Sequence, residues 1–360
     1  MNALTVVILA FSVLGAVDWL IGNKIGVGKE FERAFLLFCP LALSMLGMIV
    51  VAPAVGVWLS PLFDGFYALF GIDPSIIPAS LLANDMGGAV LAQSVGKSEL
   101  LGNYNAFIVS SMMGCVISFT LPFSLGLVRK EQYPQLFVGL LCGIATIPVG
   151  CLAAGLVCRV PFGALLLDLL PLILVGGLIT LALLFFKTAC IKCFAVLGYV
   201  MRVVSLAGLL CAIFTFLTKV EISPHFDSFE NAALICANAC VTLSGALPLM
   251  YLLTKLLHKP LNVVGAKIGV NDVSAIAFLG TLVTNASTFG TMEKMDKKGT
   301  ALNAAFAVSA SFALGDHLAF TMAYDGTYVL PMILGKLVSG VCAVLLALVM
   351  YKEKPQKRIE

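Results

Sequence analysis

The sequence predicts an all-α polytopic membrane protein of two inverted repeats, with about nine crossing helices and two re-entrant or broken hairpin segments. The prediction rests on an apolar composition, on two polar interruptions and on the placement of basic residues. The chain has 360 residues, of which 60% are hydrophobic and 11% are charged. Soluble domains have about 25% charged residues and cannot bury this much apolar surface. We therefore expect one transmembrane domain over residues 1–360.

Eleven apolar segments divide the chain, and most have close to the ~20 residues that cross a bilayer as a helix. They cover residues 3–21, 34–59, 76–92, 106–128, 136–157, 165–186, 194–217, 232–253, 273–292, 301–323 and 328–351. Polar residues interrupt the third segment at 84–88 (NDMGG) and the ninth at 284–288 (TNAST). Non-helical backbone at membrane depth is tolerated only where it is buried in protein or lines a water-filled cavity. Both interruptions therefore predict a binding site or a pathway.

The two halves of the chain match each other at nearly constant offsets. An offset of 198 relates FERA at 31–34 to FENA at 229–232. An offset of 201 relates later pairs, namely Asn84 and Asn285, Ser110 and Ser311, Gly114 and Gly315, and Thr120 and Thr321. Transporters are often built from such duplicated halves. We predict repeat one over about 1–158, a linking helix over about 165–186 and repeat two over about 194–351.

The basic residues favour a re-entrant course for the two interrupted segments. If all eleven segments cross, the better orientation places 13 loop lysines and arginines inside and 7 outside. If segments 76–92 and 273–292 do not cross, the counts become 17 and 3, a far better fit to the positive-inside rule. The halves are then inverted, with the N-terminus outside and the C-terminus in the cytoplasm. A broken helix that does cross is the alternative.

The polar residues in and near the interruptions predict a site for a small cation. The candidate residues are Asn84, Asp85, Gly87, Gly88, Ser110, Thr284, Asn285, Ser311, Asp316 and His317. Acids inside a membrane mark binding sites or pathways, and the carbonyls that end a half-helix add partial negative charge. The two acids would neutralise the cation, the two amides and Thr284 would contact it, and the two serines would line its path. The two glycines would let the backbone approach the ligand closely.

Several of these residues have a second interpretation. Asp85 is also suited to cap the half-helix that follows it, because Asp is favoured at that position. Asp316 and Lys336 have opposite charges and lie in consecutive apolar segments, so they are candidates for a structural ion pair. His317 is a candidate proton acceptor, or a hydrogen-bond partner of a neighbouring residue.

Arg202 lies alone in the middle of its apolar segment and is predicted to be a structural counter-ion, with Asp168 or Asp18 as its partner. The sequence has no GxSxG, HExxH or P-loop motif, so we expect neither an enzyme nor an ATP-driven pump. The CxxC at Cys190 and Cys193 has no second pair or histidine cluster beside it, so we expect no metal and no cofactor.

Seven longer motifs identify a resemblance that covers the whole chain in order. They are LLANDMGGAVLAQ, SSMMGCVISFTLPFSLG, TIPVGC, HKPLNVVGAKIGVND, MEKMDKKG, NAAFAVSASFALGDHLAF and PMILGKLVSG. With these motifs the chain resembles the EutH family, the permeases of the bacterial ethanolamine-utilisation system. The connection at 218–229 is more compact than in some members of that family. The resemblance implies uptake of ethanolamine across the cytoplasmic membrane for ammonia-lyase chemistry in the cell; it supplies no binding residues.

The expected partners are ethanolamine and the lipid bilayer, with no nucleic acid; a homo-oligomer is compatible with the sequence. Three other functions are open at this point. They are a channel-like facilitator, a transporter of another small amine coupled to Na⁺ or H⁺, and a scaffold or sensor that transports nothing. The polar interruptions argue against the scaffold or sensor, for which they would serve no purpose.

Overall fold

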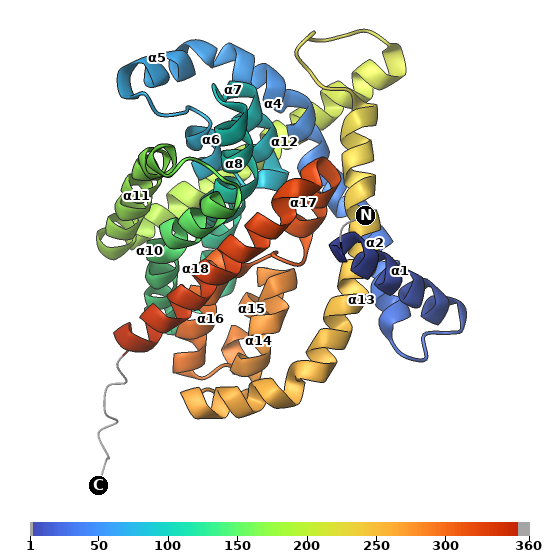
Figure 1. Ribbon diagram of the computed structural model, residues 1–360, viewed down its shortest axis with the longest axis vertical. Helices are drawn as coiled ribbons and strands as arrows, with labels where there is room; N and C mark the ends of the chain where they lie inside the picture. The colour runs from blue at the N-terminus through green and yellow to red at the C-terminus, as the bar shows by residue number, and fades with distance from the viewer. Residues whose placement is uncertain (1–2, 352–360) are drawn as a thin grey trace.

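The computed structural model describes residues 3–351, and the regular elements in this range are all helices (Figure 1). The charged C-terminal residues predicted to be cytoplasmic, at 352–358, lie outside it. The helices up to the middle of the chain are α1 (Ala3–Leu20), α2 (Val27–Leu36), α3 (Phe38–Leu41), η1 (Ala42–Leu46), α4 (Gly47–Trp58), α5 (Ser60–Phe70), α6 (Ile76–Leu81), η2 (Asn84–Met86), α7 (Gly88–Val95), α8 (Glu99–Tyr104), η3 (Asn105–Gly114), η4 (Val116–Thr120), α9 (Leu121–Leu127), η5 (Lys130–Gln132) and α10 (Tyr133–Val157).

The remaining helices are α11 (Phe162–Phe185), α12 (Lys187–Thr218), α13 (Phe229–Ile268), α14 (Asp272–Val283), α15 (Asn285–Thr291), η6 (Met292–Lys294), α16 (Lys297–Ala310), α17 (Asp316–Asp325), η7 (Gly326–Tyr328) and α18 (Val329–Met350). All eleven predicted apolar segments are largely helical, with breaks in segments 76–92, 273–292 and 301–323. The structure adds α5, which the sequence did not predict, and extends α13 to 40 residues. Within segment 106–128, η3 and η4 are π-helical.

Eight stretches of the described chain are helical, long and apolar enough to cross a membrane, one fewer than the nine predicted crossings. The difference lies in predicted segment 301–323. There α16 has 14 residues and α17 has 10, and the chain between them, at 311–315, is not helical. Each half is therefore too short to cross alone. The expectation of an all-α polytopic membrane protein is confirmed.

Both interrupted segments form hairpins whose two ends lie together. In the first, an Asp73 carboxylate oxygen accepts hydrogen bonds from the backbone N–H groups of Lys97 (3.0 Å) and Ser98 (2.9 Å). In the second, Asp296 accepts one from the N–H of Asn271 (2.9 Å). Hairpin one (α6, η2 and α7) lies towards the upper end of the molecule in Figure 1, and hairpin two (α14 and α15) lies at the lower end. That the halves are inverted repeats stays a prediction.

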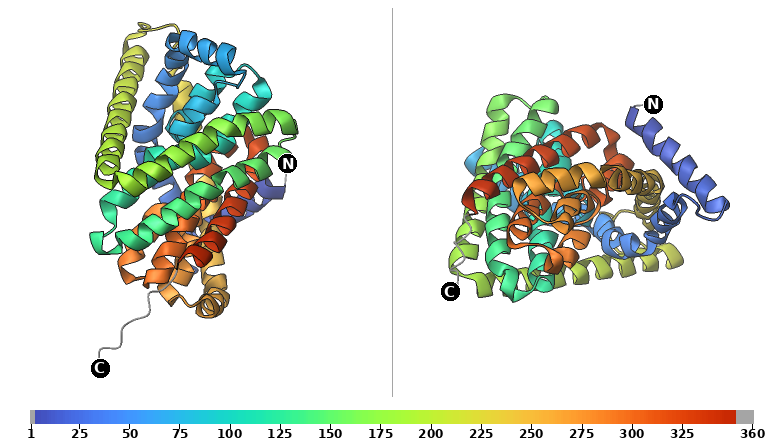
Figure 2. Two further views of the ribbon diagram at one scale, coloured as in Figure 1. Left: turned by 90° about the vertical axis from the view of Figure 1, so that its left-hand side faces the viewer. Right: turned by 90° about the horizontal axis from the view of Figure 1, so that it is seen from below.

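The helices that follow the hairpins form the centre of the molecule. In an apolar 18-residue window of the stretch Glu99–Leu127, 83% of the residues are buried, against 17% in α1. α10, α16 and α18 pack together beside this stretch. Figure 2 shows α1 (dark blue) and α12 (yellow-green) at the margin of the molecule, where few of their residues are buried. The centre therefore holds both hairpins between helices that can face lipid.

Two glycines let the central helices contact the hairpin backbones. A Cβ added at Gly114 would collide with the carbonyl oxygen of Leu82, and one added at Gly315 would collide with the carbonyl oxygen of Val283. Both the glycines and their contacts are 201 residues apart in sequence. Each hairpin is therefore held at the same place, close to its tip.

We predict that Gly114→Ala and Gly315→Ala each destabilise the protein by about 1–3 kcal/mol, because the new methyl group must displace backbone. Thermal unfolding of the purified protein in detergent would measure the loss. Gly177→Ala in α11 is the control, since no other part of the structure lies within 4 Å of a Cβ added there. Equal stability of all three variants would contradict the close contact.

The base of hairpin two depends on one carboxylate outside the membrane-crossing helices. Asp296 accepts hydrogen bonds from Asn271, from the Ser274 hydroxyl (2.8 Å) and from the N–H of Gly299 (2.9 Å) at the start of α16. Burial raises the pKa of Asp296, but the hydrogen bonds outweigh it, and the pKa lies below its ordinary value.

We predict that Asp296→Ala lowers the stability at neutral pH by about 1 kcal/mol, as loss of an N-cap does. A lowered pKa in the folded protein means that this contribution is present above the ordinary Asp pKa of about 4 and is lost as the pH falls further. The difference in melting temperature from the unsubstituted protein should therefore shrink in acid. Asp272→Ala, an exposed neighbour in α14, is the control; a difference independent of pH would contradict the prediction.

Candidate functional site

The tip of hairpin one is an irregular turn at the centre of the molecule. After α6, Leu82 and Ala83 have extended backbone, and a short 3₁₀ turn, η2, follows. Gly87 has a φ of 87°, in the left-handed region that favours glycine, and α7 begins directly after it. The Ala83 N–H donates to the Ser118 hydroxyl (3.1 Å) of the neighbouring helix. The turn thus leaves Asn84 and Asp85 between two half-helices.

The tip of hairpin two is shorter. α14 ends at Val283, the single residue Thr284 is extended, and α15 begins at Asn285. The Thr284 hydroxyl accepts a hydrogen bond from the Ala286 N–H (3.3 Å) and so caps α15. Like the tip of hairpin one, this tip contains an asparagine, which here is the first residue of the returning helix.

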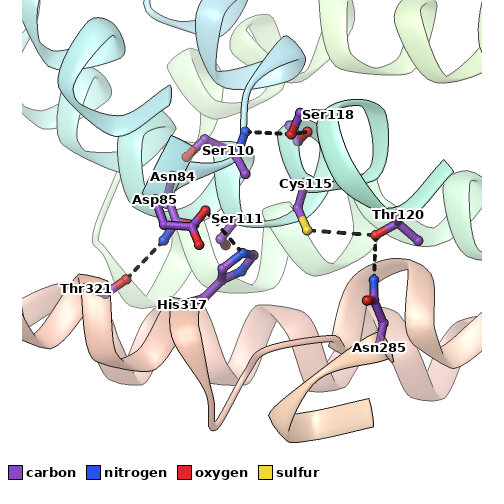
Figure 3. A network of polar contacts seen from close by, with 12 residues as sticks. Asn84, Asp85, Ser110, Ser111, Cys115, Ser118, Thr120, Asn285, His317 and Thr321 are labelled. Atoms are coloured by element: carbon purple, nitrogen blue, oxygen red, sulfur yellow. Dashed lines mark hydrogen bonds and ion pairs between the residues drawn. The ribbon is translucent and has the colours of Figure 1, made fainter. Parts of the chain in front are cut away.

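Each tip asparagine bonds to a threonine of the opposite half. Asn84 Nδ2 donates to Thr321 Oγ1 (3.4 Å), and Asn285 Nδ2 donates to Thr120 Oγ1 (3.2 Å). Figure 3 shows both contacts, which we call the crossed hydrogen bonds. The offset of 201 that relates the two asparagines also relates the two threonines. Both asparagines are fully buried, and within the described chain neither amide oxygen has a hydrogen-bond partner.

A histidine and two carboxylates lie beside the crossed hydrogen bonds. His317 Nε2 is 3.9 Å from Asp85 Oδ1, and Figure 3 shows the two side chains pointing towards each other. Asp316 interacts electrostatically with Asp85. The His317 ring also packs against Phe312, with 5.0 Å between the ring centroids. Residues of both halves thus meet at one place.

The sequence predicted one crossing helix over segment 301–323, which contains Asp316 and His317, and this is wrong. α16 ends at Ala310, and Asp316 is the first residue of α17. In the irregular chain between them, Phe312 has a φ of 63°. Its N–H donates to the Thr281 carbonyl (3.2 Å), and the Leu314 N–H donates to the Leu282 carbonyl (2.8 Å). The backbone bonds to hairpin two in place of its own helix, and Asp316 begins a new half-helix.

A cavity of about 750 Å³ leads from the surface of the bundle to these residues. Asp85, Asp316 and His317 line its buried part, and Tyr199 and Leu127, both exposed, line its outer part. Its remaining lining residues come from α3, η1, the tip of hairpin one, the helices around η4 and α9, α12 and the break before α17: Leu41, Ser44, Ala83, Met86, Cys115, Ser118, Phe119, Pro122, Phe123, Gly126, Ala195, Gly198, Arg202 and Phe312. We call it the acidic cavity.

A second cavity, of about 480 Å³, reaches the tip of hairpin two from between α2 and α13. Thr284 and Ser287 line it at the hairpin, and Arg33, Lys255 and His258 line it on the other side. We call it the basic cavity. The two tips therefore face different cavities.

Three of the ten predicted site residues, Asp85, Asp316 and His317, line the acidic cavity, and Thr284 lines the basic one. The others do not line either cavity. Gly87 and Gly88 serve the turn, because a Cβ on Gly88 would collide with the Leu82 carbonyl of the same hairpin. Asp85 lies in η2 and does not cap α7, which has no side-chain cap.

The two predicted serines are buried and line neither the acidic nor the basic cavity. The Ser110 hydroxyl donates to the Ala106 carbonyl, and the Ser311 hydroxyl donates to the Ala307 carbonyl, four residues back in each case. Serine often makes such a bond within a helix, where it satisfies the hydroxyl locally. The two equivalent bonds, 201 residues apart, add to the match between the halves.

The predicted ion pairs are not formed. Lys336 is buried and its Nζ donates to the Ser111 carbonyl (2.5 Å); no carboxylate of the described chain lies within 4.0 Å of it. Arg202 is exposed and lines the acidic cavity. Both of its predicted partners have other donors: Asp18 accepts from three backbone N–H groups, and Asp168 accepts from Asn105.

Sequence reasoning missed Thr120 and Thr321 as members of the site. The offset of 201 had already paired the two threonines with each other, as it had paired the asparagines. The offset does not show that each asparagine bonds to the threonine of the other half. The repeat thus relates the four residues in sequence, but it does not indicate which residue of the other half each tip contacts.

The chain is similar to known proteins over nearly its whole length. Residues 1–350 match the family described as "Ethanolamine utilisation protein, EutH". A protein of Listeria monocytogenes named probable ethanolamine permease EutH is 39% identical over 96% of this chain and 93% of its own. Proteins of the same name from Salmonella typhimurium and Escherichia coli are each 35% identical over 90% of this chain and 86% of their own.

Bacillus subtilis has a relative, named uncharacterized protein YxeR, that is 32% identical over 99% of this chain and 98% of its own. No solved structure matches the chain. The family match covers residues 1–350, which include both hairpins and the helices that follow them in this chain. This chain is a multi-pass membrane protein that belongs to the EutH family.

Proposed function

We propose that this protein transports ethanolamine, in its protonated form, across the bacterial cytoplasmic membrane. The observation that carries the proposal is that Asp85 and Asp316, one from each half, line the same cavity. Three of the relatives are named for ethanolamine permeation. A cation that leaves water needs opposite charge and hydrogen-bond acceptors around it, and this cavity supplies both.

The chemistry of the cavity suits the two ends of ethanolamine. Its ammonium group offers three N–H donors, and its hydroxyl group both donates and accepts. Asp85 and Asp316 would take the ammonium. The free amide oxygens of Asn84 and Asn285 are buried beside them and would accept from the ammonium or the hydroxyl once the tips separate. His317 would bond the hydroxyl or hold Asp85 in place.

The crossed hydrogen bonds favour a carrier over a channel-like facilitator. They hold each tip against the opposite half. A substrate that moves past the tips has to separate at least one of these contacts. Separation of one contact while the other stays formed is the behaviour of a carrier that opens to one side at a time.

We also propose an orientation, with the N-terminus outside. The base of hairpin one carries Lys97, which pairs with Asp64 on the surface, and the base of hairpin two carries Lys298. The positive-inside rule places the first base outside and the second in the cytoplasm. The cavities would then lie between inverted halves, as in transporters whose sites form at a repeat interface.

We predict that Asp85→Asn and Asp316→Asn each weaken ethanolamine uptake by about 10- to 100-fold. A hydrogen bond to a charged group contributes ~1.5–3 kcal/mol, which corresponds to this range. The measurement is uptake of labelled ethanolamine into proteoliposomes, with unlabelled ethylamine as a competitor. Asp64→Asn, an exposed acid at the surface, is the matched control.

Equal amounts of inserted protein must be shown for every variant by purification from the vesicles. Saturable uptake that ethylamine inhibits would support a cation site, whereas flux that never saturates would favour a channel. Full uptake by both acidic-site variants would remove Asp85 and Asp316 from the proposed site. No uptake by any of the inserted proteins would favour a scaffold or sensor.

We predict that cysteines placed at Lys97 and Lys298 react from opposite sides of the membrane. The exposed Cys39 and Cys193 would first be replaced by Ser. A membrane-impermeant thiol reagent added to intact cells should label Lys97→Cys, and should label Lys298→Cys only after the cells are opened. Labelling of both positions from the same side would contradict the inverted arrangement.

A further inference from the structure

A second buried acid lies outside both cavities. Asp168 belongs to α11, the predicted linking helix, and only 1% of its surface is exposed. Its Oδ1 accepts a hydrogen bond from Asn105 Nδ2 (3.2 Å), and Asn105 is fully buried at the start of η3. Neither residue lines the acidic or the basic cavity. The proposed transport site therefore does not use them.

The pair is connected to the base of hairpin one. Asn105 Nδ2 also donates to the Ser75 hydroxyl (2.9 Å), and this hydroxyl donates to Asp73 Oδ1 (2.6 Å). The other oxygen of Asp73 accepts from the N–H groups of Lys97 and Ser98, where the hairpin closes. Both oxygens of Asp73 are thus satisfied. The same network joins three elements: α11, η3 and hairpin one.

Two oxygens of this network are unsatisfied. Within the described chain, Asp168 Oδ2 and Asn105 Oδ1 are buried and have no hydrogen-bond partner. In the same part of the chain, no Lys, Arg or His nitrogen lies within 4.0 Å of Asp168. Neither oxygen receives a hydrogen bond in the described chain. A buried carboxylate that has an unsatisfied oxygen and no positive charge beside it is strongly destabilised.

The neighbouring titratable groups do not supply that charge. Asp168 interacts electrostatically with Asp73, Tyr104 and Cys151, which are acids or neutral groups. The Tyr104 hydroxyl already donates to the Cys151 carbonyl (3.0 Å) and so is not available to Asp168. The missing partner is therefore a species from outside the chain.

We propose that Asp168, Asn105 and Ser75 bind a small monovalent cation, either a sodium ion or a proton. Carboxylate, amide and hydroxyl oxygens are the ligands that hard cations prefer, and a proton on Asp168 would serve the same two unsatisfied oxygens. Bound there, the cation joins α11 to the base of hairpin one. The coupling of this site to uptake rests on the proposed function; the binding itself does not.

The first test is thermal unfolding of the purified protein with no amine present. Sodium chloride is compared with potassium chloride and N-methylglucamine chloride at equal ionic strength, because a ligand that binds only the folded state raises the melting temperature. If the cation is sodium, the melting temperature rises with sodium alone, and Asp168→Asn abolishes the rise. Asp64→Asn, the surface control, keeps it.

The second test distinguishes the proton. The infrared spectrum of the protein at neutral pH should show the carbonyl band of a buried protonated carboxylic acid, and Asp168→Asn should remove that band. Should Asp168→Asn fail to fold, Asn105→Ser takes its place, with a weakened sodium effect or a shifted band expected. Neither a sodium effect nor a band assignable to Asp168 would overturn the proposal.

The readouts separate this proposal from the transport proposal. Thermal unfolding and the infrared spectrum are both measured on the protein without substrate. A protein that binds the cation but transports no ethanolamine would therefore still show the sodium effect or the infrared band. Conversely, uptake that is lost in Asp85→Asn while the sodium effect or the infrared band persists would show that the two sites are separate.

Discussion

The lack of hydrogen-bond partners in a lipid bilayer is the constraint on which the structure depends. Wherever the backbone leaves the helix at the centre of the molecule, its N–H groups must bond to other parts of the protein. Phe312 and Leu314 bond to the carbonyls at the end of α14, and Ala83 bonds to the Ser118 hydroxyl. Close packing at Gly114 and Gly315 makes these contacts feasible. The hairpins and the central helices therefore stabilise each other, and neither would keep its irregular backbone alone.

The same constraint explains why the polar side chains gather where they do. Breaks in the helices expose chain ends, which supply hydrogen-bond partners for buried carboxylates and amides. Asp85 lies in the turn of hairpin one, and Asp316 begins α17. Lys336, by contrast, reaches an intact helix and bonds to a single carbonyl there. The acidic cavity thus forms where both halves leave regular structure, and it collects the charges of both.

Much of this arrangement could be predicted from the sequence. Polar interruptions and the placement of lysines and arginines predicted both hairpins, and intramembrane charge predicted Asp85 and Asp316. The break at 311–315 could not be predicted, because SFALG reads as a continuous apolar helix and only its hydrogen bonds to hairpin two decide otherwise. The local bonds of Ser110 and Ser311 could not be predicted for a related reason: a serine hydroxyl in a helix can donate to a carbonyl of its own helix or remain free for a ligand. Contacts between residues more than 160 positions apart, such as Asn285 with Thr120, are invisible to local patterns.

The crossed hydrogen bonds bear on the origin of the chain. In a symmetric dimer, residue i of one subunit contacts j of the other, and j contacts i in return. Subtraction of the offset of 201 maps Asn285 onto Asn84 and Thr321 onto Thr120. The bonds of Asn84 with Thr321 and of Asn285 with Thr120 then join the same two positions in both directions, as this rule requires. A half-length ancestor with one asparagine and one threonine would make the same two bonds with a second copy inserted in the opposite direction. Fusion of two such copies would keep the interface and free each half to change, which accounts for an acid at Asp85 but an alanine, Ala286, at the matching position.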